Sequence, residues 1–140
     1  MQTMTAKRYL KHHEVATLRL QALERTIAEL YSKAFPAQVT DGEPPVQGNV
    51  SDRTGSLAVK IADMRLDAEA LWYEQQIIRR EIERTIFAVE DPNQIRVLKA
   101  KYIDLKGWSE IADEMDKTER TVQRIHGEAL VEVEKLLEEQ

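Results

Sequence analysis

The stretch from Trp108 to Leu130 has the spacing of two short helices joined by a tight turn. Counted from Trp108 as the first position, its small and apolar residues occupy positions four, five, eight, fifteen and eighteen, which are Ile111, Ala112, Met115, Val122 and Ile125. Two helices that cross at a steep angle bury side chains at these positions, and the fifth must be small where the second helix approaches. The spacing therefore predicts a helix-turn-helix, the motif of many DNA-binding proteins.

Local signals indicate where the two helices begin and end. Gly107 is a suitable N-cap for a helix from about Trp108 to Met115. Asp116 stands at the turn, where Asp is among the few residues that tolerate a left-handed conformation. Either Asp116 or Thr118 could begin the second helix, because acidic and hydroxyl side chains both serve as caps.

The second helix would bury Val122, Ile125 and Ala129 and leave a polar side open to a major groove. Arg pairs bidentately with guanine or phosphate, and Gln pairs with adenine, so Arg120, Gln123 and Arg124 are the candidates for groove contacts. Taken singly, each could equally be a solvated residue of a surface helix. The candidate DNA-binding residues, among which the threonines would contact phosphates or base edges and the lysines phosphates, are Lys106, Lys117, Thr118, Glu119, Arg120, Thr121, Gln123 and Arg124.

Several segments carry a resemblance to a known family. They are YID at 102–104, Trp108, EIA at 110–112, ERTVQRIHGEAL at 119–130 and, more weakly, GNVSDRTG at 48–55. With these segments the chain resembles small phage-encoded regulators related to the late-gene activators of the RinA and ArpU type. More distantly it is similar to the promoter-reading region 4 of bacterial sigma factors. The resemblance implies a sequence-specific regulator of transcription, of late genes, in the cytoplasm of a bacterial host.

The chain departs from the pattern of that family in two places. Leu105 and Gly107 stand where the family has Gly and Ser or Thr, which concerns the start of the first helix. Lys117 stands where an apolar residue is usual, which indicates a more exposed turn.

Upstream of this region, two long helices are expected. Apolar positions step by threes and fours from Tyr9 to Ala34 and again from Leu57 to Val89, which is the coiled-coil spacing. Pro and Gly between them predict a loop at 35–50. The first seam comprises Tyr9, His13, Ala16, Leu20, Leu23, Ile27, Leu30 and Ala34, and the second comprises Leu57, Ile61, Met64, Ala68, Leu71, Gln75, Ile78, Ile82 and Val89.

These elements predict an all-α chain with two parts. Residues 1–91 would form a long antiparallel, coiled-coil-like helical hairpin that serves oligomerisation. Asp91-Pro92-Asn93 would break the second helix and begin another at about 93–104. Residues 92–140 would then form a trihelical DNA-binding domain similar to sigma region 4, with a recognition helix at about 118–129 that continues to the end of the chain.

A second apolar stripe on the long second helix predicts that a further element or subunit packs against it. Leu66, Tyr73 and Ile77 follow one another at spacings of seven and four, with Trp72 beside them. The stripe could pack within the monomer, against the C-terminal unit or against a second subunit. We favour a homodimer or higher homo-oligomer, because a two-helix hairpin has no depth in which to bury a widened face.

The charge distribution also favours an oligomer or a partner protein. The formal net charge is −5, but residues 92–127 carry seven Lys or Arg against six Asp or Glu. Residues 128–140 carry one Lys against five Glu, which we expect to form a solvated face. Such a weak excess of positive charge predicts modest affinity for duplex DNA from a single subunit.

Composition and motifs argue against a disulfide-bonded, membrane-spanning, metal-binding or catalytic protein. The absence of Cys excludes disulfides, thiol catalysis and thiolate zinc sites, and no apolar run has the length of a membrane span. His12, His13 and His126 lack carboxylates at metal-ligand spacing, and the chain has no phosphate-binding Gly-rich loop or nucleophile motif. We therefore expect no enzyme, no cofactor and no metal, and we expect His126 to pack near the trihelical core or to reach a phosphate.

Two alternative functions stay open on the same sequence features. A small terminase subunit also joins a DNA-reading helical unit to an oligomerising hairpin, but it works in genome packaging as a ring. In a third interpretation the sigma-like unit is an adaptor that binds RNA polymerase and never reads bases.

Overall fold

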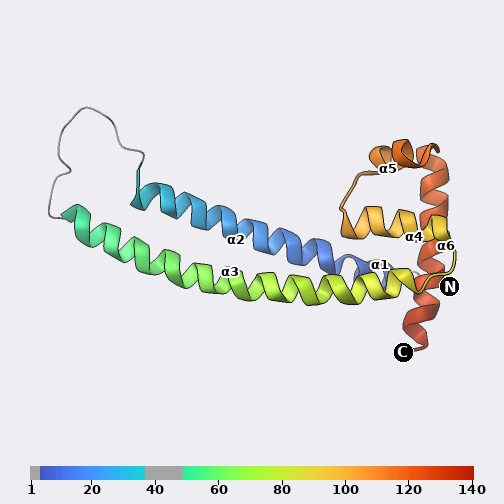
Figure 1. The fold of residues 1–140 in the computed structure, drawn as a ribbon, viewed down its shortest axis with the longest axis horizontal. Helices are drawn as coiled ribbons and strands as arrows, with labels where there is room; N and C mark the ends of the chain where they lie inside the picture. The colour runs from blue at the N-terminus through green and yellow to red at the C-terminus, as the bar shows by residue number, and fades with distance from the viewer. Residues whose placement is uncertain (1–3, 37–48) are drawn as a thin grey trace. The chain divides into compact units, whose positions relative to one another are not determined.

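The computed structural model describes residues 4–36 and 49–140, and every element in this part of the chain is helical (Figure 1). The all-α class is therefore confirmed. The loop expected at 35–50 falls mostly on residues outside the described ones. The elements are α1 (Met4–Leu10), α2 (His12–Ala34), α3 (Asn49–Phe87), α4 (Pro92–Leu98), the π-helix η1 (Lys99–Ile103), α5 (Trp108–Met115) and α6 (Glu119–Glu138).

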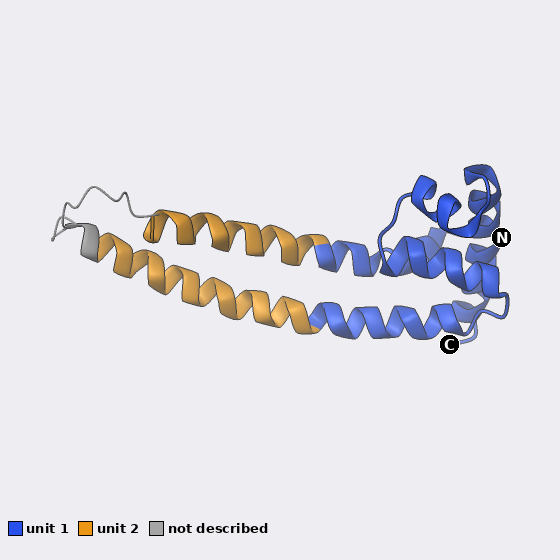
Figure 2. Ribbon diagram, turned by 45° about the horizontal axis from the view of Figure 1, so that its top comes forward, with its two compact units in different colours: residues 1–17, 74–140 blue, residues 18–73 orange. Residues whose placement is uncertain are grey.

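The chain divides into two compact units (Figure 2). Unit 1 comprises Met1–Thr17 and Glu74–Gln140, and unit 2 comprises Leu18–Tyr73. This division differs from the boundary at residue 91 that the sequence suggests. The reason is that α1 and the last turns of α3 share a hydrophobic cluster with α4, η1 and α6.

Unit 2 consists of parts of α2 and α3 that lie side by side (Figures 1 and 2). Ile27 and Ala34 of α2 are buried with Ile61 of α3, and the guanidinium of Arg65 lies 5.8 Å from the centroid of the Tyr31 ring. The residues partly buried around this cluster are Leu23, Leu30, Leu57, Met64 and Ala68, all of them positions of the two predicted seams. A stripe that recurs every three or four residues faces one side of a helix, so these side chains meet between the helices.

The first cluster of unit 1 places α1 against α6. Its buried members are Ala6, Leu10, Ile82, Ile86, Val89, Leu98, Tyr102, Ile103, Ala129, Leu130 and Val133. The backbone N–H of Ala6 donates to the carboxylate of Glu134 at 2.8 Å, and Glu134 is only 7% exposed. Glu134 therefore departs from the solvated acidic face expected for residues 128–140, because it binds the first turn of α1.

His13 and Ile86 also differ from the predicted seam. The imidazole Nδ1 of His13 lies 3.0 Å from the backbone oxygen of Tyr102, so His13 is buried against η1. Ile86 is fully buried, although the predicted seam passed from Ile82 to Val89. Helix α3 ends at Phe87, and the turn that follows lets both Ile86 and Val89 reach the cluster.

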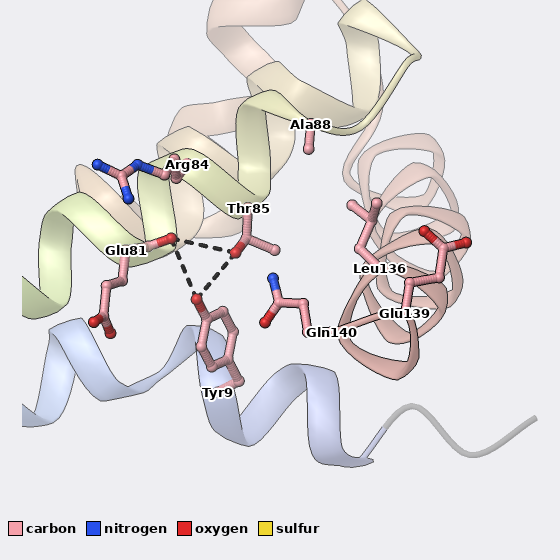
Figure 3. A pocket seen from close by; sticks show the side chains of 8 residues that line it. All are labelled: Tyr9, Glu81, Arg84, Thr85, Ala88, Leu136, Glu139 and Gln140. Atoms are coloured by element: carbon pink, nitrogen blue, oxygen red, sulfur yellow. Dashed lines mark hydrogen bonds between the residues drawn. The ribbon is translucent and has the colours of Figure 1, made fainter.

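A hollow of about 590 Å³ lies where α1, α3 and the end of α6 meet (Figure 3). The Tyr9 hydroxyl donates to the backbone oxygen of Glu81 at 3.2 Å and lies 3.0 Å from the hydroxyl oxygen of Thr85. These contacts fasten α1 to α3 within unit 1. The lining residues are Tyr9, Glu81, Arg84, Thr85, Ala88, Leu136, Glu139 and Gln140.

Candidate nucleic-acid interface

Helix α5 and the turn after it have the predicted local structure. Gly107 is the N-cap in an extended conformation, and the helix ends at Met115. Asp116 is left-handed, with φ 54° and ψ 43°, as the sequence predicts for the turn. The backbone N–H of Lys117 donates to the oxygen of Ala112 at 3.0 Å, which satisfies a carbonyl that the end of the helix leaves open.

Leu105, on the other side of α5, is also left-handed, with φ 57°. Gly adopts such a conformation without strain, whereas a side chain with a Cβ meets the following carbonyl oxygen. Two left-handed residues, Leu105 and Asp116, therefore define the entry to α5 and the exit from it.

Thr118, rather than Asp116, begins α6. Its hydroxyl oxygen accepts the backbone N–H of Thr121 at 3.1 Å, which is the N-cap arrangement. The Thr118 hydroxyl in turn donates to the Thr121 hydroxyl oxygen at 2.9 Å. The Thr121 proton therefore remains available for an external acceptor such as a phosphate oxygen.

A compact apolar cluster holds α5 and α6 together. Ala112 is 4% exposed at the fifth position of the motif, and Ile111 and Val122 are fully buried. Val97 of α4 and Ala100 of η1 also belong to the cluster. The members of the cluster are Val97, Ala100, Ile111, Ala112, Met115, Val122 and Ile125, with Trp108 packed against them.

The opposite side of the start of α6 is polar and open to solvent. Glu119, Arg120, Gln123 and Arg124 are exposed, and Thr121 is half-buried. Spacings of three and four residues place Arg120, Gln123 and Arg124 on one helix face. The Arg124 guanidinium forms an ion pair with Glu128 at 3.0 Å, and both side chains are more than half exposed. An exposed pair of this kind contributes about 0–1 kcal/mol, so a phosphate or a guanine could replace Glu128 at small cost.

The two candidate lysines differ in their surroundings. The Lys106 ammonium lies 2.7 Å from a carboxylate oxygen of Glu114, and this hydrogen bond is the main reason that the pKa of Lys106 is raised. Lys106 is therefore held against α5. Lys117 is exposed in the turn, beside Thr118 and Thr121, on the rim of a shallow groove of about 590 Å³. The structure brings Lys117 next to the start of α6, whereas the Lys106 ammonium is paired with Glu114 of α5.

Three aromatic rings connect η1, α5 and α6 beneath this surface. The Tyr102 hydroxyl lies 2.6 Å from Nε2 of His126, and the two rings stack with centroids 5.6 Å apart. The Trp108 ring meets His126 edge-on, with centroids 4.8 Å apart. His126 therefore packs in the core, the first of the two roles expected for it.

Burial keeps this pair uncharged at neutral pH. Desolvation, followed by the charges of Lys7 and Lys101, lowers the pKa of His126 to about 4. Desolvation, followed by the charge of Glu14, raises the pKa of Tyr102 to about 12. A neutral imidazole hydrogen-bonded to a neutral phenol leaves no unpaired charge in the core.

Two cations near this surface, Lys7 and Lys101, were not among the sequence candidates. The Lys101 ammonium lies 4.4 Å from the centroid of the Trp108 ring, a cation–π arrangement. Lys7, from α1, is close enough to lower the pKa of His126. The basic cluster Lys7, Arg8 and Lys11 is visible in the sequence. Because residues 1–91 were expected to form a separate hairpin, the sequence did not place this cluster beside α6.

No family model, curated protein or solved structure matches this chain. We therefore infer its function from the geometry of its own residues. Across residues 4–36 and 49–140, the helices are too short or too polar to cross a membrane.

Proposed function

We propose that this chain is a sequence-specific DNA-binding regulator of transcription, of phage origin and acting on late genes in the bacterial cytoplasm. In this proposal α4 with η1, α5 and α6 form a trihelical helix-turn-helix unit, and the long helices α2 and α3 form an oligomerising hairpin. The observation that carries the proposal is the face of Arg120, Gln123 and Arg124. It is exposed at the start of a helix whose other side is anchored in an apolar cluster.

The proposed mode of binding follows from the chemistry of that face. The start of α6 enters the major groove, where a guanidinium can pair with the O6 and N7 atoms of guanine and the Gln123 amide can pair with adenine. The Thr121 hydroxyl and the Lys117 ammonium bind phosphate oxygens on the flanks of the groove. The buried cluster beneath fixes the angle of α6, so the contacts have a defined register.

A second subunit is part of the proposal. Leu66 and Tyr73 of α3 are 66% and 57% exposed, and they stand seven residues apart, so they share one face of the helix. Ile77 is 62% exposed as well. An aliphatic and aromatic face of this kind is suited to pairing with a second copy. The solution mass tests this directly, since a dimer supports regulation whereas a ring of eight or more subunits would favour genome packaging.

The experiment for DNA binding uses the purified full chain to select duplexes from a pool with a randomised centre. The affinity of the recovered duplex is then measured for the wild type and for the double variant Arg120→Ala, Arg124→Ala. Each good bidentate contact is worth about 1–3 kcal/mol, so a loss of at least about tenfold is expected.

The matched control is Arg25→Ala, Arg53→Ala, which removes two exposed arginines from unit 2. This control should bind nearly as the wild type does. If the double variant in α6 kept both the affinity and the salt dependence of the wild type, the recognition surface would not be on α6.

A further inference from the structure

We infer that α1, together with Lys11 directly after it, is a second DNA-contacting element, whose exposed Lys7, Arg8 and Lys11 bind the phosphate backbone beside the groove entered by α6. This inference rests on the proposed DNA-binding function and adds to it a contact surface from the other end of the chain.

Helix α1 is a fixed platform in unit 1. Leu10 is fully buried, and the Ala6 N–H is bound by the Glu134 carboxylate at 2.8 Å. The Tyr9 hydroxyl contacts Thr85 on α3, and His13, just after α1, contacts η1 through the oxygen of Tyr102. The three cations are thus presented from a surface that is anchored to α6 and to its neighbours.

The exposed charged side chains of α1 and of the turn after it are all basic. Residues 4–13 contain three cations and no Asp or Glu, and Lys7, Arg8 and Lys11 are all exposed. These three side chains converge around one open hollow of about 410 Å³, which Met4, His12 and Val15 complete. Glu134 is bound to the Ala6 N–H, and Glu14 is half-buried near Tyr102. No carboxylate of α1 itself neutralises the cluster.

The cluster lies beside α6, because Ala6 and Leu10 of α1 share a buried cluster with Ala129, Leu130 and Val133 of α6. Lys7 and Lys101 both act on His126, and Lys101 covers the Trp108 ring that touches His126. Gln123 lies one turn before His126 on α6. A duplex bound by this turn of the recognition helix would then have one of its strands beside the cations.

This placement supplies the charge that the C-terminal region lacks. Residues 92–127 carry seven cations against six acids, which is a weak basis for phosphate binding. Residues 7–11 add three cations without an acid. Each neutralised phosphate contributes about 0.9 to the slope of log affinity against log salt concentration, so three contacts would contribute between two and three.

The test compares Lys7→Gln, Arg8→Gln, Lys11→Gln with Lys33→Gln, Arg53→Gln, Lys60→Gln, both in the full chain. The second variant removes the same charge from exposed positions of unit 2. The probes are the fluorescein-labelled duplex recovered by selection and an unrelated duplex of equal length, titrated between about 50 and about 200 mM KCl. Circular dichroism melts establish that the variants fold.

The α1 variant should lower the salt slope by about two or more and weaken both duplexes by a similar factor, because phosphate contacts carry no sequence information. The unit 2 variant should keep a slope within about half a unit of the wild type. Equal slopes for the two variants would overturn the inference.

The Arg120→Ala, Arg124→Ala variant separates this inference from the proposed function. If that variant loses the preference for the selected duplex while the α1 variant keeps the wild-type slope, only the role of α1 is refuted. If the wild type selects no duplex, the DNA-binding function fails, and the role of α1 fails with it.

Discussion

The neutral His126 ring should make the stability of unit 1 depend on pH. Its pKa is about 4 in the folded chain and about 6.5 when the ring is exposed to water. The unfolded chain therefore binds a proton between these values and the folded chain does not. The contribution of the neutral His126 ring to the free energy of unfolding is fully present above pH 6.5 and is lost as the pH falls toward 4. One pKa unit is worth about 1.4 kcal/mol, so the full loss is about 3 kcal/mol, of which about 2 kcal/mol is lost between pH 7.5 and pH 5.

The assay is urea unfolding at pH 7.5 and pH 5, followed by Trp108 fluorescence in a Trp72→Phe background. His126→Phe keeps an aromatic ring but no titrating group. Its free energy of unfolding should therefore change between the two pH values by about 2 kcal/mol less than that of the wild type. The titration of carboxylates is common to both proteins and cancels in the comparison.

Tyr102→Phe is the matched control, because burial rather than the Tyr102 hydroxyl is the main cause of the lowered pKa. It should lose about 1–3 kcal/mol at both pH values and keep the pH dependence of the wild type. A wild-type protein whose stability fell no more than that of His126→Phe would refute the assignment of a neutral, buried imidazole.

Three further substitutions test the local structure around α5 and α6 by thermal or urea unfolding. Leu105→Gly should stabilise the chain by about 0.5–1 kcal/mol, because it relieves a left-handed conformation, and a loss of stability would contradict that φ. Ile111→Ala should cost about 2–5 kcal/mol, since Ile111 is fully buried in the α5–α6 cluster, and a cost below 1 kcal/mol would mean that the cluster is not packed. Gly127→Ala should stabilise α6 by about 0.5–1 kcal/mol, because an added Cβ meets open space, and destabilisation would place a neighbour there.

The parts of the fold that depend on near neighbours in the chain could be predicted from the sequence. The ends of α5, the left-handed Asp116 and the burial of Ile111, Ala112 and Val122 agree with the spacing of one short segment. Helical periodicity also identified the seam positions of α2 and α3 that meet in unit 2. In both cases the signal lies within a few turns of helix.

The parts that depend on distant residues could not be predicted. Glu134 looked like a member of an acidic, solvated face, yet its carboxylate binds an N–H of α1 that is 128 residues away in the chain. The heptad-like pattern ran on through Tyr9 and His13, so it concealed that α1 packs against α6 in unit 1. A coiled-coil pattern specifies which face is apolar, but it does not specify which partner covers that face.

The candidate site shows the same division. The exposed face of Arg120, Gln123 and Arg124 follows from helical spacing alone. The pairing of Lys106 with Glu114 and the approach of Lys7 and Lys101 to His126 depend on tertiary packing. The near-neutral charge of residues 92–127 therefore did not include all the cations around α6, because Lys7 lies outside that range.

A missing-contact measurement tests whether α6 reads base pairs. The affinities of the wild type and of Arg120→Ala are compared on the selected duplex and on every single base-pair variant of it. Arg120→Ala should become indifferent at one base pair, where the wild type discriminates by about 1–3 kcal/mol, and should discriminate normally elsewhere. If Arg120→Ala, Gln123→Ala and Arg124→Ala each discriminated at every position as the wild type does, α6 would not be the reading helix.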